Sequence, residues 1–178
     1  MLTGKSILHV NQGLGRCFST TDVCGYYNDL TEKVTKLPKL LDNNGLPRVE
    51  DEKGEEILFP VAVFQYGLGA YDLYLLEHDE RYLKKFFQCV DWAMQNQENS
   101  GAWNNFFFIY PQTPYGAMCQ GEGASLLIRA YKHSGNSIYL TAAQKAIDFM
   151  LIPMRNGGTV NETEESMVLL EYTHLPAV

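Results

Sequence analysis

The chain has 178 residues, of which 46% are hydrophobic and 12% aromatic, enough for one core and for no more than one domain. Its net charge of −7 at pH 7 argues against a broad basic face for nucleic acid, and against a polyanionic ligand unless cations are placed locally. No apolar run reaches the roughly 20 residues that span a bilayer, so no membrane insertion is expected.

The first 58 residues lack a regular hydrophobic period. Residues 6–10 alternate like a short strand, and residues 42–56 combine an Asn-Asn-Gly turn signal with a dense acidic run. A short helix is predicted near Thr31, with Thr31 as its cap. We therefore expect an irregular or β-hairpin segment over residues 1–58, in one domain with the rest. No signal peptide is visible, which slightly favours a cytoplasmic location for the chain as given.

Four helices are predicted between residues 60 and 151. Pro60 stands in the first turn of one that runs to Glu77 and is apolar on all sides, which is typical of a helix buried on most faces. Asp79 can cap the second, whose apolar positions recur at spacings of three and four. The third covers about residues 115–133 and the fourth about residues 137–151.

The helical region repeats itself. Residues 66–70 return as 120–124, and Asp91-Trp92 returns as Asp148-Phe149, at an offset of 148 − 91 = 57. A single helical hairpin cannot bury its own apolar face, so neighbouring hairpins are needed. The sequence therefore predicts an all-α fold, an incomplete (α/α) toroid over residues 59–178. A third hairpin would begin at Pro176, and an open barrel edge of this kind predicts a homodimer.

The cysteines and histidines give no metal signature. Cys17, Cys24, Cys89 and Cys119 contain no CxxC pair, and no histidine stands at zinc-ligand spacing. Cys89 and Cys119 fall within helical patterns and are predicted to be reduced core residues, whereas a disulfide between Cys17 and Cys24 stays open. The glycine pairs lack the strand–turn–helix context of a phosphate loop, so nucleotide binding is not expected.

Several motifs follow one another along residues 59–178. They are Phe59-Pro60 with Gln65-Tyr66-Gly67-Leu68, Asp91-Trp92 with Asn96-Gln97 and Gly101-Ala102-Trp103, Tyr115-Gly116-Ala117-Met118-Cys119-Gln120-Gly121 with Arg129-Ala130-Tyr131, and Glu171-Tyr172-Thr173. This ordered set resembles the C-terminal catalytic domain of the D-glucuronyl C5-epimerases, which act on heparan-type polysaccharides. Two family parts have no counterpart, the β-rich N-terminal portion and a C-terminal Trp-Asp-Tyr-His motif, so the chain resembles a truncated member. Thr173 stands where the family has proline.

The resemblance implies an isomerase, at least in the full-length protein, that needs no cofactor. In such a reaction the C5 proton of a D-glucuronate residue is removed and returned on the opposite face, which gives L-iduronate within a polysaccharide. A uronate-containing polysaccharide is then the expected partner.

Proton removal beside a carboxylate needs a base and an acid on opposite faces of the sugar. Tyr172 is predicted to transfer the proton, with Glu171 as a base or orienting carboxylate. The predicted substrate-binding residues are Tyr115, Gln120, Tyr66, Gln65 and Trp103. Structural alternatives stand beside these roles: a packed rim tyrosine for Tyr172, an amide that satisfies a loop backbone for Gln120, and packing between hairpins for Trp103.

Two other functions stay open. The first is another glycan-active enzyme on the same architecture, either a polysaccharide lyase or a glycoside hydrolase, which needs two carboxylates such as Glu122 and Glu171. The second is a non-catalytic array of hairpins that binds glycans.

Overall fold

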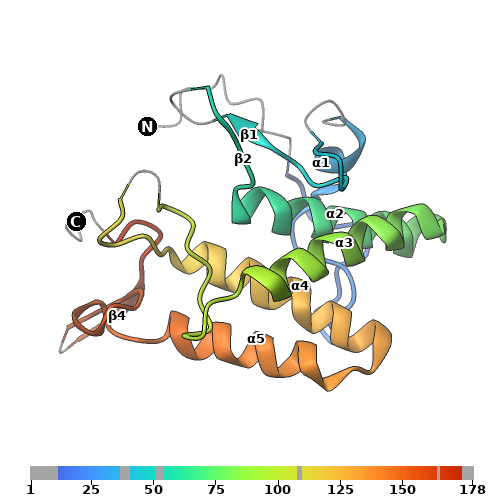
Figure 1. Cartoon of the computed structure of the whole chain (residues 1–178). Coiled ribbons are helices and arrows are strands. Elements are labelled where there is room, and N and C mark those ends of the chain that lie inside the picture. The colour runs from blue at the N-terminus through green and yellow to red at the C-terminus, as the bar shows by residue number, and fades with distance from the viewer. Residues whose placement is uncertain (1–11, 37–40, 51–53, 108–109, 164, 174–178) are drawn as a thin grey trace. The chain divides into compact units, whose positions relative to one another are not determined.

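The computed structural model describes residues 12–36, 41–50, 54–107, 110–163 and 165–173 (Figure 1). The chain forms two compact units, Met1–Asp91 and Trp92–Val178, and the division between them falls within a helix. The predicted strand over residues 6–10 and the predicted helix start at Pro176 lie outside the described residues. The one-domain organisation stays a prediction.

The described residues of the N-terminal unit form helices and one small hairpin. Its elements are α1 (Thr31–Thr35), β1 (Val49–Glu50), β2 (Glu56–Ile57), α2 (Pro60–Glu77) and α3 (Glu80–Asn96), the last of which continues into the C-terminal unit. β1 and β2 pair antiparallel, with Val49 opposite Ile57. The acidic stretch of the sequence therefore does form a hairpin.

The helices α2 and α3 follow the sequence prediction closely. Pro60 is the first residue of α2, where its missing N–H costs no hydrogen bond, and every residue from Pro60 to Leu73 is buried. The Asp79 carboxylate accepts the backbone N–H of Arg81 at 2.9 Å, as expected for a cap of α3. Four apolar side chains of α3 are fully buried: Phe86, Cys89, Val90 and Ala93.

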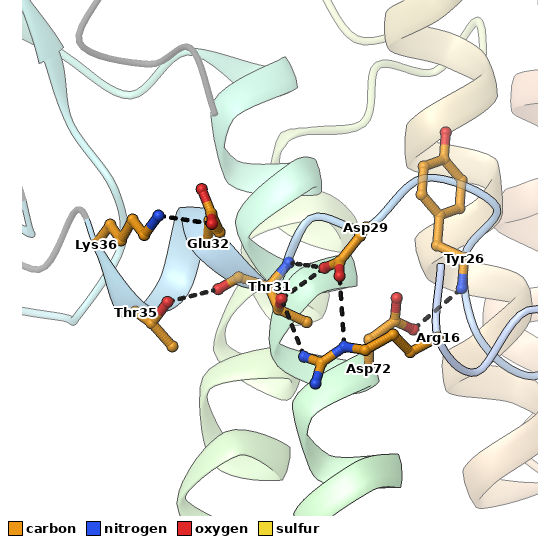
Figure 2. A network of polar contacts seen from close by, with 8 residues as sticks. All are labelled: Arg16, Tyr26, Asp29, Thr31, Glu32, Thr35, Lys36 and Asp72. Carbon is orange, nitrogen blue, oxygen red and sulfur yellow. Dashed lines mark hydrogen bonds and ion pairs between the residues drawn. The ribbon is translucent and has the colours of Figure 1, made fainter. Parts of the chain in front are cut away.

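Polar contacts order the segment before α1, and the bond between Tyr26 and Asp72 joins this segment to α2 (Figure 2). The predicted cap was wrong: Thr31 is the first residue of α1, and the Asp29 carboxylate accepts its N–H at 2.9 Å and its hydroxyl at 2.5 Å. Arg16 pairs with Asp29 at 3.4 Å, and the buried Asp72 of α2 accepts the N–H of Tyr26 at 3.0 Å. The carboxylate that bonds the start of α1 is therefore that of Asp29, two residues before the helix, and not the hydroxyl of Thr31.

The C-terminal unit is built on the antiparallel pair α4 and α5, which lie side by side (Figure 1). Its elements are α4 (Ala117–Ser134), α5 (Ser137–Met150), the 3₁₀ turn η2 (Met154–Asn156), β3 (Val160–Glu162) and β4 (Met167–Leu169). Its fully buried side chains include Trp103, Leu126, Leu127, Ala146 and Val160. The antiparallel β3–β4 hairpin, with Val160 opposite Leu169, was not among the predicted elements.

The described residues are mainly helical, which confirms the all-α class. No helix among them is both long and apolar enough to cross a membrane. All four cysteines are free thiols, and Cys89 and Cys119 are buried as predicted.

Candidate functional site

The loop after β4 is bonded to the start of α4. The carbonyl of Leu170 accepts the N–H of Ala117 at 2.9 Å, and the hydroxyl of Thr173 donates to the carbonyls of Tyr115 at 3.0 Å and Thr113 at 3.2 Å. Thr173 is buried, so these bonds are shielded from water. Residues 171 and 172 stand between these two attachments, so Glu171 and Tyr172 are held against the first turn of α4.

The Glu171 carboxylate lies at the N-terminal end of α4. Its Oε2 accepts the backbone N–H of Met118 at 3.0 Å. The approach is close, because a Cβ added to Gly116 would lie 2.4 Å from the carbonyl oxygen of Glu171 and 3.2 Å from Oε2. A residue with a side chain at position 116 would displace Glu171, so this glycine is needed for the contact.

Burial raises the pKa of Glu171 to about 7, against the opposing effect of the Met118 N–H, which favours the charged form. A carboxyl group with such a pKa can both take up and release a proton near neutral pH. Of the predicted residues, Glu171 therefore has the electrostatic setting that a general acid or base needs.

Tyr172 combines a fixed ring with exposure. The ring stacks on Phe106, with centroids 5.5 Å apart and planes inclined by 28°. Phe106 is buried while Tyr172 is 45% exposed, so one face is supported by the core and the rest of the side chain is open to solvent. A tyrosine held in this way could meet a ligand without losing much conformational freedom.

Tyr115 makes a hydrogen bond that the sequence did not reveal. Its hydroxyl donates to Glu98 Oε2 at 2.7 Å, and its ring meets Phe149 edge to face at 4.8 Å. Burial, followed by the bond to Glu98, raises the pKa of Tyr115 to about 12, so the phenol keeps its proton at neutral pH. Glu98 is 17 residues away in sequence, so no helical spacing could have linked the two.

Gln120 and Trp103 are bonded to each other. The Gln120 side chain is fully buried; its Oε1 accepts the N–H of Trp103 at 2.8 Å, and its Nε2 donates to the carbonyl of Trp103 at 3.0 Å and of Gly116 at 3.2 Å. The indole N–H of Trp103 donates to the carbonyl of Ala93 at 2.9 Å. Gln120 thus satisfies backbone groups of a loop, and Trp103 is packed in the core, as the structural alternatives to substrate binding predict. A contact of either residue with a substrate stays a prediction.

The other two predicted residues lie in the N-terminal unit. Tyr66 is 2% exposed, and its hydroxyl accepts a hydrogen bond from the Lys85 ammonium at 3.0 Å. Gln65 is also buried. Within the C-terminal unit, the structure brings together Glu171, Tyr172 and Tyr115, and Gln120 and Trp103 lie in the core of this unit.

Two further residues near this loop escaped the sequence analysis. One is Glu98, and the other is Asn105, which is fully buried and whose carboxamide bonds to no protein atom among the described residues. A buried polar group without a protein partner is unusual in a folded protein. Within the described part of the chain, no group of three His, Cys, Asp or Glu side chains could hold a metal ion.

Comparison with known proteins connects this site to a family. The family model described as "D-glucuronyl C5-epimerase C-terminus" matches residues 88–178, which is 178 − 88 + 1 = 91 of 178 residues. A D-glucuronyl C5-epimerase of Caenorhabditis elegans is 29% identical over 110 residues. That alignment covers 57% of this chain and 18% of the relative, so the chain spans only a small part of that protein's length. The match includes α4, α5 and the Glu171–Tyr172 loop, and the chain belongs to the family of the D-glucuronyl C5-epimerase C-terminal domain.

Proposed function

We propose that the chain carries part of a catalytic centre that epimerises D-glucuronate to L-iduronate residues in a polysaccharide. The observation that carries the proposal is the Glu171–Tyr172 pair, fixed on the first turn of α4 within the segment that matches the epimerase family. In this proposal the helices α2–α5 contribute hairpins to an (α/α) toroid.

The chemistry consists of two proton transfers at one carbon. The C–H bond at C5 breaks, its electron pair is delocalised into the adjacent carboxyl group, and a new C–H bond forms on the opposite face of the ring. Negative charge therefore accumulates beside a carboxylate, and the reaction requires hydrogen-bond donors there as well as a base and an acid.

Glu171 and Tyr172 can divide these tasks. The pKa of Glu171 is about 7, so the ionised carboxylate is available as a base near neutral pH, or can orient a neighbouring phenol. The exposed Tyr172 is the group that would meet the sugar, either to donate the returning proton or to stabilise the carboxyl group by a hydrogen bond. Both roles need the loop to keep its position on α4.

The test is incorporation of solvent deuterium at C5 of a glucuronate-containing polysaccharide, followed by NMR in D₂O. We expect exchange with the unchanged chain, a loss of at least about a hundredfold with Tyr172→Phe, and a similar loss with Glu171→Gln. Tyr139→Phe removes one hydroxyl from α5 and serves as the matched control that keeps exchange.

Three results would contradict the proposal. Folded protein without any exchange would exclude epimerase chemistry for this chain. Exchange that survives Tyr172→Phe and Glu171→Gln would move the chemistry to other residues. A product that absorbs in the ultraviolet, together with chain cleavage, would identify a lyase instead.

A further inference from the structure

The hydrogen bond between Tyr115 and Glu98 joins two segments that bracket the site. Its 2.7 Å length is typical of a strong bond from a hydroxyl to a carboxylate. Both side chains are only partly exposed, and burial strengthens such a bond. The ring of Tyr115 also packs edge to face on Phe149, which restricts the orientation of the phenol.

The Glu98 end of this bond is anchored by main-chain contacts. Glu98 lies in a turn closed by two bonds of 2.9 Å, from its N–H to the carbonyl of Ala102 and from the N–H of Gly101 to its carbonyl. The Gln97 amide then ties the turn to α5, because it donates to the carbonyls of Gly101 and Ala142 at 2.9 Å each. The main chain of Glu98 is therefore held in place, and its carboxylate can fix the position of the Tyr115 hydroxyl.

The Tyr115 end leads directly to the candidate catalytic residues. Its carbonyl accepts the hydroxyl of Thr173, the residue after Tyr172. The next residue, Gly116, is in contact with the main chain of Glu171, and two residues later the N–H of Met118 is bonded to the Glu171 carboxylate. A displacement of Tyr115 would therefore disturb these three contacts of the loop.

We propose that Glu98 is a positioning residue, which holds Tyr115 and through its main chain holds Glu171 and Tyr172 on α4. Glu98 does not touch the sugar in this proposal. The inference rests on the proposed function for the roles of Glu171 and Tyr172, but the mechanical link between Glu98 and Glu171 can be measured without any substrate.

The experiment uses the full chain with ¹³C-labelled glutamate carboxyl groups, and the Glu171 signal is assigned with Glu171→Gln. Burial raises the pKa of Glu171 and the Met118 N–H lowers it, so that pKa responds when the loop moves. Tyr115→Phe breaks the bond to Glu98 without removing a charge, so a change in the pKa of Glu171 in that variant reports a displaced loop and not a lost charge. We expect Glu98→Ala and Tyr115→Phe to lower the pKa of Glu171 by about one and to reduce deuterium exchange about tenfold or more.

Glu98→Gln is the conservative rescue, because its amide oxygen can still accept the Tyr115 hydroxyl. We expect it to retain the pKa of Glu171 and most of the exchange rate. Glu162→Ala, which removes an exposed carboxylate from β3, is the matched control for loss of negative charge. If Glu98→Ala does not fold, Tyr115→Phe removes the same bond with a smaller change.

The outcomes separate the two proposals. A shifted pKa of Glu171 in a protein that never exchanges deuterium would support the positioning role and contradict the proposed function. An unchanged pKa and exchange rate in Glu98→Ala and Tyr115→Phe would overturn the positioning role, as would a Glu98→Gln variant that behaves like Glu98→Ala.

Discussion

At the scale of single residues, Glu171 is placed in two opposing environments. The end of α4 offers it an N–H group and the positive end of a helix dipole, which favour the ionised form, while burial favours the protonated form. Burial has the larger effect, and the pKa rises from the ordinary 4.5 to about 7. The residue is thus kept protonated in part at neutral pH, at a cost in stability.

That cost makes folding stability depend on pH. The native chain binds the Glu171 proton more tightly than the unfolded chain does, so the bound proton stabilises the folded state. This stabilisation is fully present below pH 4.5 and is lost as the pH rises through 7. Glu171→Gln cannot ionise and keeps an acceptor for Met118. We expect the free energy of unfolding of the unchanged chain to fall by ~1–2 kcal/mol relative to Glu171→Gln between these pH values, after allowance for solvent screening.

Urea unfolding of both proteins at several pH values measures this difference. A constant difference across the range would show that Glu171 titrates normally, and the argument for its catalytic use near neutral pH would lose its support.

A second prediction at this scale concerns Thr173, whose hydroxyl is hydrogen-bonded to two backbone carbonyls. Thr173→Val keeps the shape of the side chain but leaves the carbonyls of Thr113 and Tyr115 without this donor. We expect a loss of about 1–3 kcal/mol in the free energy of unfolding. Thr173→Ser retains the hydroxyl and should lose less than half as much. Equal losses in the two variants, measured in urea, would mean that the bonds do not hold the loop.

At the scale of elements, two glycines of α4 look alike in the sequence and differ in the fold. A Cβ added to Gly123 would lie 2.4 Å from the ring of Trp103, whereas one added to Gly121 would meet only the sulfur of Met150 at 3.7 Å. The absence of a side chain at Gly123 therefore permits the helix to approach the indole, whereas a side chain at position 121 would have room.

We expect Gly123→Ala to destabilise the protein by about 1–3 kcal/mol, because the buried Trp103 must move. Gly121→Ala should be neutral or stabilising by up to about 1 kcal/mol, since alanine favours the helix. Thermal unfolding followed by circular dichroism compares the two. A Gly123→Ala variant as stable as Gly121→Ala would contradict the packing of α4 on Trp103.

The helices were predictable because their signals are local. Pro60, Asp79 and the spacing of Phe86, Cys89, Val90 and Ala93 act within a few residues, and the structure has α2 and α3 where these signals placed them. The β3–β4 hairpin was missed because its strands are only three residues long and β4 is exposed on every residue, so no buried face marks it.

The candidate site was predictable only in part, for a related reason. Glu171 and Tyr172 were identified through family motifs, but their environment depends on contacts with residues 53 or more positions away, such as Met118. The contact of Glu98 with Tyr115, and the use of both polar ends of Gln120 by Trp103, likewise depend on tertiary structure. Composition and periodicity carry no signal for such pairs.

At the scale of the whole molecule, each of the two units contains a fully buried cysteine. Cys89 lies in the N-terminal unit and Cys119 in the C-terminal unit, and both are fully buried with pKa values raised by that burial. Cys17 and Cys24 are partly exposed, and the pKa of Cys17 is raised by burial and then by Asp72 and Cys24. Each unit therefore has its own buried reporter.

We expect a thiol reagent such as Ellman's reagent to modify Cys24 and, more slowly at neutral pH, Cys17 in the native protein. Cys89 and Cys119 should be protected at least about a hundredfold, because a buried thiol reacts only when its unit opens. Peptide mapping after timed labelling identifies each site, and Cys89→Ala and Cys119→Ala assign the two slow phases. Labelling of Cys119 at the rate of Cys24 would mean that α4 is not packed as described. Separate rates for the two buried thiols would measure how independently the units open, and a common rate would show that they unfold together.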